Sequence, residues 1–201
     1  MKKILVAIVA VLFAAPSFAQ FGSGGFSLTE STMYYGVRLG LNVASLSGDI
    51  SSDWGAKAGF NFGGVVGMRL SDATPIFLES GLYYTERGAK DGDAKIGLTY
   101  LEIPLLIKYG IQATDDIAVL PYIGPAVGLG IAGKIKPGSV SSFGSDGGFN
   151  RPDVGIKLGC GAEYNHLYLE AGYQFGMANI ADSDDDTVHG NAFFVNFGVN
   201  F

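Results

Sequence analysis

The feature that most restricts the fold of this chain is a strict alternation of apolar and polar residues. From Tyr35 to Val43 every odd-numbered residue is apolar, and every even-numbered residue is Gly, Arg or Asn. Successive side chains of a β-strand point to opposite faces, so the pattern predicts a strand with one apolar and one polar face. Eight such strands are predicted, at about residues 34–45, 57–70, 78–87, 100–109, 119–131, 153–164, 167–176 and 193–201.

The strand lengths and the charges predict where these strands lie. Most of them have about ten residues or more, the length that a tilted strand needs to cross a bilayer. The mean hydropathy of +0.28 is high, yet after residue 20 no apolar run is long enough for a spanning helix. The charges within the strands fall on the polar face: Arg38, Lys57, Arg69, Glu79, Arg87, Glu102, Lys108, Asp153, Lys157, Glu163 and Glu170.

The connections alternate between short and long. Those at 71–75, 112–116 and 165–166 are short, whereas those at 46–56, 88–96, 133–151 and 178–190 are longer and rich in Gly, Ser and Asp. This alternation is typical of outer-membrane barrels. We therefore predict an all-β fold: an eight-stranded antiparallel transmembrane β-barrel, an up-and-down meander with short periplasmic turns, four longer extracellular loops and periplasmic termini.

The N-terminal residues predict export. Lys2 and Lys3 precede an apolar stretch, and the small residues Ser17 and Ala19 favour cleavage before Gln20. We divide the chain into a signal peptide (1–19), a flexible leader (20–33) and the barrel (34–201). The predicted location is the outer membrane of a Gram-negative bacterium.

The lumen of eight strands is narrow enough for side chains to fill. Because buried charges persist only when they are paired, we expect the eleven charges to form a network across it. A narrow pore is the alternative, favoured by the many small residues on the polar face. Pro104, Pro121 and Pro125 lie within strands, where each removes a backbone donor. They predict a bulge or a weakened seam between the fourth and fifth strands.

No residue pattern marks a catalytic centre. Ser183, Asp186 and His189 share one predicted loop, and His166 lies in a turn, but side chains of these types in loops are usually solvated. The acidic run 182–186 is dense in oxygen ligands but lacks the spacing of an EF-hand, so it does not by itself predict calcium binding. Cys160 lies on the apolar face of its strand, so we interpret it as a small hydrophobic residue rather than a reactive thiol.

We predict no enzyme activity, no cofactor and no metal site. The Gly/Ser-rich segment 138–150 is the expected contact point on the surface.

Four segments carry a resemblance to a known family: GVRLGLN (36–42), YLEIPLLIKY (100–109), YIGPAVGLGIAG (122–133) and NFGVNF (196–201). With them, residues 34–201 resemble the PorT-like outer-membrane β-barrel family, whose members are often called porin family proteins. The resemblance implies an eight-stranded outer-membrane barrel, and implies that Phe201 is the aromatic last residue recognised by the barrel-assembly machinery. The namesake belongs to a protein secretion and gliding system. No catalytic residues follow from the resemblance.

We therefore expect a non-enzymatic integral outer-membrane protein with a filled lumen, serving envelope structure or contacts through its loops. The alternatives are a small passive pore, a component of an envelope secretion system and a soluble lipocalin-like barrel. The expected partners are outer-membrane lipid and lipopolysaccharide, the barrel-assembly machinery during insertion, and envelope proteins. The net charge of −6 argues against nucleic acid.

The assignment of faces predicts which substitutions block insertion. Leu41→Arg and Ile103→Arg should abolish the heat-modifiable gel shift of the folded barrel, because a base at the bilayer midplane costs about 2–4 kcal/mol. A loop substitution, Ser142→Arg, should leave the shift unchanged. Equal shifts in all three variants would contradict the assignment.

Overall fold

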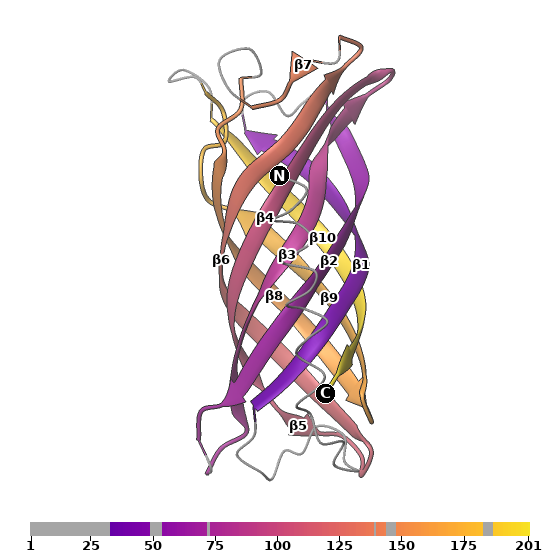
Figure 1. The fold of residues 1–201 in the computed structure, drawn as a ribbon, viewed down its shortest axis with the longest axis vertical. Helices are drawn as coiled ribbons and strands as arrows, with labels where there is room; N and C mark the ends of the chain where they lie inside the picture. Colours follow the sequence, from indigo (N-terminus) through magenta and orange to yellow (C-terminus); the bar gives the residue numbers. More distant parts are fainter. Residues whose placement is uncertain (1–32, 49–53, 72, 139, 144–147, 183–186) are drawn as a thin grey trace, which may run out of the picture.

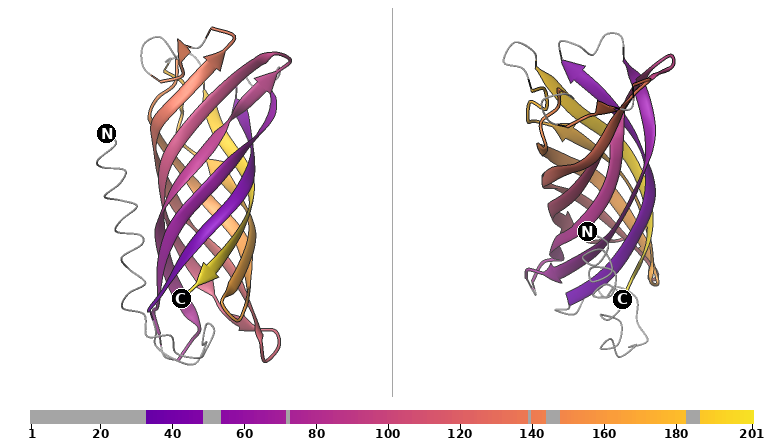
Figure 2. Two further views of the ribbon diagram at one scale, coloured as in Figure 1. Left: turned by 45° about the vertical axis from the view of Figure 1, so that its right-hand side comes forward. Right: turned by 45° about the horizontal axis from the view of Figure 1, so that its top comes forward.

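The computed structural model describes residues 33–48, 54–71, 73–138, 140–143, 148–182 and 187–201. These residues form a closed, eight-stranded antiparallel β-barrel with strongly tilted strands (Figures 1 and 2). The predicted signal peptide and all of the leader except Met33 lie outside the described residues. The barrel strands are β1 (Met33–Gly48), β2 (Gly55–Arg69), β3 (Ile76–Asp91), β4 (Ala94–Tyr109), β6 (Ile117–Lys136), β8 (Pro152–Tyr164), β9 (Leu167–Gly176) and β10 (Val188–Asn200). Two short strands, β5 (Ile111–Gln112) and β7 (Val140–Ser141), pair with β6.

Each barrel strand pairs with the barrel strands that precede and follow it along the chain, and β1 pairs with β10 to close the sheet. The closing ladder runs from the Gly36–Asn200 pair to the Gly48–Val188 pair. The predicted up-and-down meander is thus confirmed. The described residues contain no helix that is long and apolar enough to cross a membrane.

The two faces of the sheet differ as the alternation predicts. Large apolar side chains cover the outer wall, where Leu39 is 62% exposed and Leu129 is 55% exposed. The interior instead holds charged and polar side chains that are almost fully buried. A water-soluble barrel has the reverse distribution, so this chain is built for an apolar solvent.

The two ends of the barrel differ in their connections. At one end, which we call the turn end, adjacent strands are joined by residues 70–75, 110–116 and 165–166. Asn165 adopts a φ of 54° in the tightest of these turns, a conformation that Asn tolerates better than most residues. At the opposite end, which we call the loop end, the strands are joined through residues 49–54, 92–93, 137–151 and 177–187.

The predicted loop at 88–96 is wrong. β3 and β4 continue through it with regular pairing up to Asp91 and Ala94, so only residues 92 and 93 form the turn. Gly92 has a φ of 51°, which suits a two-residue hairpin. The strands extend because Ala89 and Ile96 on their inner face are buried in an apolar cluster at the loop end. Three longer connections therefore remain at this end.

The pairing between β4 and β6 is interrupted as predicted, although only one of the two interruptions lies at a proline. The ladder between β4 and β6 shifts register beyond the Thr99–Ala132 pair, and it also lacks the pairs that would involve Leu105 and Leu106. The second gap lies opposite Pro125, whose nitrogen has no proton to donate. The ladder between β6 and β8 runs unbroken past both Pro121 and Pro125.

Several described residues of the connection between β6 and β8 are buried rather than exposed to solvent. Phe143 and Phe149 are 5% and 6% exposed, and Ser142 is fully buried with its hydroxyl donating to the Gly97 carbonyl at 2.8 Å. The expectation of an exposed contact loop is wrong for these residues, because their aromatic rings pack onto the end of the barrel. Residues 144–147 lie outside the described part.

The burial of Ser142 changes the control for the insertion experiment. Leu41 and Ile103 are 56% and 50% exposed on the outer wall, so the losses expected for Leu41→Arg and Ile103→Arg stand. Ala113→Arg is the better control, because Ala113 is exposed in a turn beyond the barrel wall. We expect a normal heat-modifiable gel shift for Ala113→Arg alone.

Candidate functional site

The interior of the barrel holds two layers of charged side chains. Nine of the eleven charges that the alternation assigns to the polar face are at most 8% exposed. We call the layer nearer the loop end the upper layer and the other the lower layer. The upper layer comprises Arg87, Glu102, Asp153, Lys157 and Gln174; the lower layer comprises Tyr34, Arg38, Glu79, Lys108, Glu163, Tyr168, Glu170, Asn196 and Asn200.

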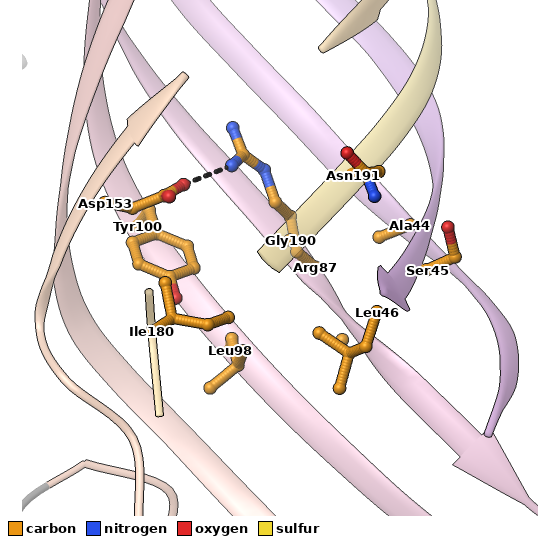
Figure 3. A pocket seen from close by; sticks show the side chains of 11 residues that line it. Ala44, Ser45, Leu46, Arg87, Leu98, Tyr100, Asp153, Ile180, Gly190 and Asn191 are labelled. Carbon is orange, nitrogen blue, oxygen red and sulfur yellow. Dashed lines mark hydrogen bonds and ion pairs between the residues drawn. The ribbon is translucent and has the colours of Figure 1, made fainter. Parts of the chain in front are cut away.

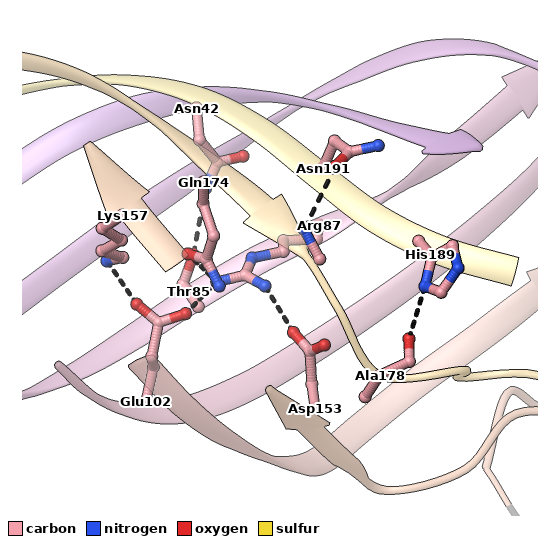
Figure 4. Close-up of polar contacts among 11 residues, drawn as sticks. Asn42, Thr85, Arg87, Glu102, Asp153, Lys157, Gln174, Ala178, His189 and Asn191 are labelled. Atoms are coloured by element: carbon pink, nitrogen blue, oxygen red, sulfur yellow. Dashed lines mark hydrogen bonds and ion pairs between the residues drawn. The ribbon is translucent and has the colours of Figure 1, made fainter. Parts of the chain in front are cut away.

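Arg87 organises the upper layer (Figure 4). Its Nη1 lies 2.7 Å from Asp153 Oδ2, and its Nη2 donates to Gln174 Oε1 at 2.7 Å and also pairs with Glu102. The second oxygen of Glu102 pairs with Lys157. These side chains come from β3, β4, β8 and β9, so the ion pairs cross the lumen and link opposite walls. Two bases and two acids make this layer electrically neutral.

Glu79 organises the lower layer. Lys108 Nζ lies 2.8 Å from Glu79 Oε1, and Arg38 Nη2 lies 3.5 Å from Oε2. The Tyr34 hydroxyl donates to the same carboxylate at 2.8 Å. The Arg38 guanidinium is 4.0 Å from the centre of the Tyr168 ring, so an aromatic face supplies further stabilisation of the cation.

Two further buried acids are held by neutral donors. Asn196 Nδ2 and the Tyr168 hydroxyl donate to Glu170 at 2.7 and 3.3 Å. Asn200 Nδ2 donates to Glu163 Oε2 at 2.7 Å. Hydrogen bonds to a buried carboxylate offset part of its desolvation, as buried charges require.

Lys57 and Arg69 lie apart from the two layers. The Lys57 ammonium donates to the Arg87 carbonyl at 3.3 Å, and the carboxylate acting on it most strongly is Glu86 rather than a lumen acid. β2 carries a register shift between Ala56 and Asn61, which removes Lys57 from the regular alternation. Arg69 ends β2 at the turn end, where its Nε donates to the Ser71 carbonyl at 2.7 Å.

The predicted assembly residue lies at the turn end. Phe201 pairs with Tyr35 through two backbone hydrogen bonds of 2.7 and 3.1 Å, and its ring is 48% exposed. Its role in assembly stays a prediction.

A buried apolar cluster lies at the loop end, and we call it the cap. Its buried members from the connections are Phe143, Phe149, Ile180 and Ala181, and they pack on residues of β1, β3, β4 and β10. Phe143 meets Tyr100 edge to face with centroids 5.7 Å apart. Asn150 joins the two connections, because its backbone N–H donates to the Ile180 carbonyl at 2.8 Å and its side chain to the Ala181 carbonyl at 2.7 Å.

A small cavity marks the boundary between the cap and the upper layer (Figure 3). Arg87 and Asp153 bound it with polar groups, and Leu46, Leu98 and Ile180 bound it with apolar ones. The charged side chains of the upper layer and the apolar side chains of the cap therefore line the same cavity. The order from the loop end inward is cap, upper layer and lower layer.

Among the described residues, the two histidines singled out by the sequence are each hydrogen-bonded to a backbone carbonyl. His189 Nδ1 donates to the Ala178 carbonyl at 3.0 Å, while Ser183 and Asp186 lie outside the described residues. His166 Nδ1 donates to the Asn200 carbonyl at 3.0 Å. Within the described ranges no three His, Cys, Asp or Glu side chains are grouped to hold a metal ion. Cys160 is exposed on the outer wall.

Sequence reasoning missed the neutral members of the layers and the cap. Gln174, Asn196 and Asn200 are on the polar face of their strands and could have been included as hydrogen-bond donors. Phe143 and Phe149 interrupt a Gly/Ser-rich segment, and large aromatic side chains are unusual in solvated loops. That contrast was the available signal for the cap.

Comparisons with known proteins agree with the fold. Residues 18–182 match the family described as outer membrane protein beta-barrel domain. The Neisserial surface protein A (NspA) is 20% identical, with a TM-score of 0.54 over 83% of this chain and 97% of that one. A major outer membrane protein from Thermus thermophilus is 14% identical, with a TM-score of 0.50 over 85% of this chain and 100% of that one. The comparison with curated sequences found no match.

The charge balance of the upper layer predicts that a double variant is more stable than one of its single variants. Arg87→Met should lower the free energy of unfolding by about 3–5 kcal/mol, because it leaves excess negative charge buried at Glu102 and Asp153. Arg87→Met/Asp153→Asn should be more stable than Arg87→Met alone, since the Lys157–Glu102 pair then remains neutral. Urea unfolding in lipid vesicles measures both. A double variant less stable than the single one would show that charge balance does not govern this layer.

Proposed function

The chain belongs to the outer membrane protein beta-barrel domain family, and from this premise we propose that it is a closed, non-enzymatic barrel of the outer membrane. In this proposal it supports the envelope and presents its loop end to the exterior, and it does not conduct solutes. The alternation of short and long connections supports this orientation, since outer-membrane barrels place their short turns in the periplasm.

The near-complete burial of the lumen charges is the observation that carries the proposal. Side chains lining a water-filled pore are accessible to solvent, whereas Arg38, Arg87, Glu102 and Lys108 are between 0% and 4% exposed. The ion pairs of the upper layer cross the lumen from β3 and β4 to β8. In the lower layer the ion pairs join β1, β3 and β4, and the Lys108 ammonium reaches across to donate to the Tyr168 hydroxyl of β9. A solute would have to break these contacts to pass. The cap adds an apolar barrier above them.

The resemblance to PorT-like barrels is narrower than the family match and remains a proposal. The role of the family's namesake offers one alternative, a component of an envelope secretion system, but the resemblance alone does not assign that role. Co-purification of other envelope proteins with the folded barrel, from native membranes, tests this alternative.

Conductance in a planar bilayer tests the closed lumen. We expect no discrete steps from the native barrel, because both layers block it independently. Arg87→Ser/Glu102→Ser should also be silent, since the lower layer persists, and so should Arg38→Ser/Glu79→Ser. Only a variant that combines all four substitutions, which shorten a base and an acid in each layer, with Phe143→Ser and Phe149→Ser in the cap should give steps.

The control variant carries Lys90→Ser, Asp91→Ser, Asp93→Ser and Lys95→Ser. It also removes two bases and two acids, but from the β3–β4 hairpin outside the lumen, and it should be silent. A heat-modifiable gel shift must show that every variant is folded. Reproducible steps from the native protein would replace the proposal with a pore.

A further inference from the structure

A row of lysines crosses three neighbouring strands at the loop end. Lys90 of β3 lies directly opposite Lys95 of β4, and Lys95 lies directly opposite Lys136 of β6. Lys134 follows on the same face of β6, opposite Gly97. All four lysines are exposed. We call these four residues the lysine row.

The lysine row faces outward from the barrel wall. Ala89 and Ile96, which alternate with Lys90 and Lys95, are 0% and 4% exposed in the cap, and Ile135 packs against the same cluster from β6. The lysine side chains therefore project from the opposite, outer face of the sheet. A register shift makes this possible: without the extra residue in β6, Ile135 instead of Lys136 would lie opposite Lys95.

The lysine row has no ion-pair partner among the described residues. Like charges directly opposite each other destabilise a sheet. The five ion pairs in the described part of the chain all lie in the lumen, so none involves these lysines. The nearby acids are Asp91 and Asp93 in the hairpin turn and Glu86, which interacts with Lys57. An anion from outside the chain would relieve the repulsion.

The height of the lysine row points to lipid headgroups. Below it on β6 the outer wall is apolar, with Leu129 and Ile131 at 55% and 40% exposure. From Ile131 to Lys134 a strand rises about 10 Å along its axis, or about 7 Å in height at the tilt of a membrane barrel. The polar headgroup region extends about 5–8 Å beyond the hydrocarbon core. Long lysine side chains reach back toward that region.

We propose that the lysine row binds the phosphate groups of anionic lipids in the outer leaflet around the barrel. Adjacent strands are about 4.8 Å apart, so the three paired lysines span about 10 Å, enough for one phosphate headgroup or two. The sideways orientation favours a lipid over a soluble partner, because the lipids surround the wall from which these side chains project. The proposal is independent of whether the lumen conducts.

Quenching of tryptophan fluorescence by brominated lipids tests the proposal. Trp54, the single tryptophan of the chain, packs against the cap. Every protein in the comparison therefore carries Trp54→Phe and Ile131→Trp, which places the indole on the outer wall just below the lysine row. The folded protein is reconstituted in phosphatidylcholine vesicles that contain either phosphatidic acid or phosphatidylcholine brominated near the glycerol. We expect the native protein to prefer phosphatidic acid about fivefold, with the preference falling as salt is added.

Three variants separate the lysine row from net charge. Lys90→Gln/Lys95→Gln/Lys136→Gln should lose the preference, and the corresponding triple Arg variant should keep it. Ala73→Glu/Thr74→Glu/Ala113→Glu changes the net charge by the same amount as the Gln variant, but at the turn end, and should also keep it. All three must show the heat-modifiable gel shift of a folded barrel.

Two results would overturn the proposal. One is an equal preference in the native protein and the triple Gln variant, or no preference in either. The other is a native protein without lipid preference that binds a fluorescent sulfated polysaccharide through the same lysines, which would assign the lysine row to a soluble polyanion.

Discussion

Within a bilayer every backbone N–H and C=O must find its partner inside the protein, and the rest of this structure follows from that requirement. The pairing of β1 with β10 satisfies it by removing both edges of the sheet. Closure then divides every strand into a lipid-facing and a lumen-facing side. Where prolines withhold a donor, as opposite Pro125, the ladder is interrupted locally but the barrel remains closed.

Closure with only eight strands leaves a lumen that side chains fill, and this determines its chemistry. The inner face is polar, so it can be buried only if its charges compensate one another. Arg87 and Glu79 each collect partners from several strands, and Asn and Tyr donors hold the carboxylates of Glu163 and Glu170. The same network that stabilises the interior also obstructs it.

The two ends of the barrel have different surroundings. At the turn end, short connections leave the lower layer close to the end of the barrel wall. At the loop end, Phe143, Phe149 and Ile180 cover the lumen, while the extended hairpin of β3 and β4 carries lysines beyond the apolar wall. The loop end thus combines an apolar cluster inside the barrel with a row of lysines on its outer wall.

The sequence by itself determined the number of strands, their lipid-facing side and the need for a neutral interior, because alternation and charge are local properties of each strand. The tertiary structure decided which charges meet, because register between strands distant in sequence depends on bulges that no local pattern specifies. The removal of Lys57 from the lumen and the alignment of Lys95 with Lys136 each accompany such a register shift. The cap likewise depends on the tertiary structure, since a Gly/Ser-rich segment buries its aromatic residues only where the barrel offers an apolar surface.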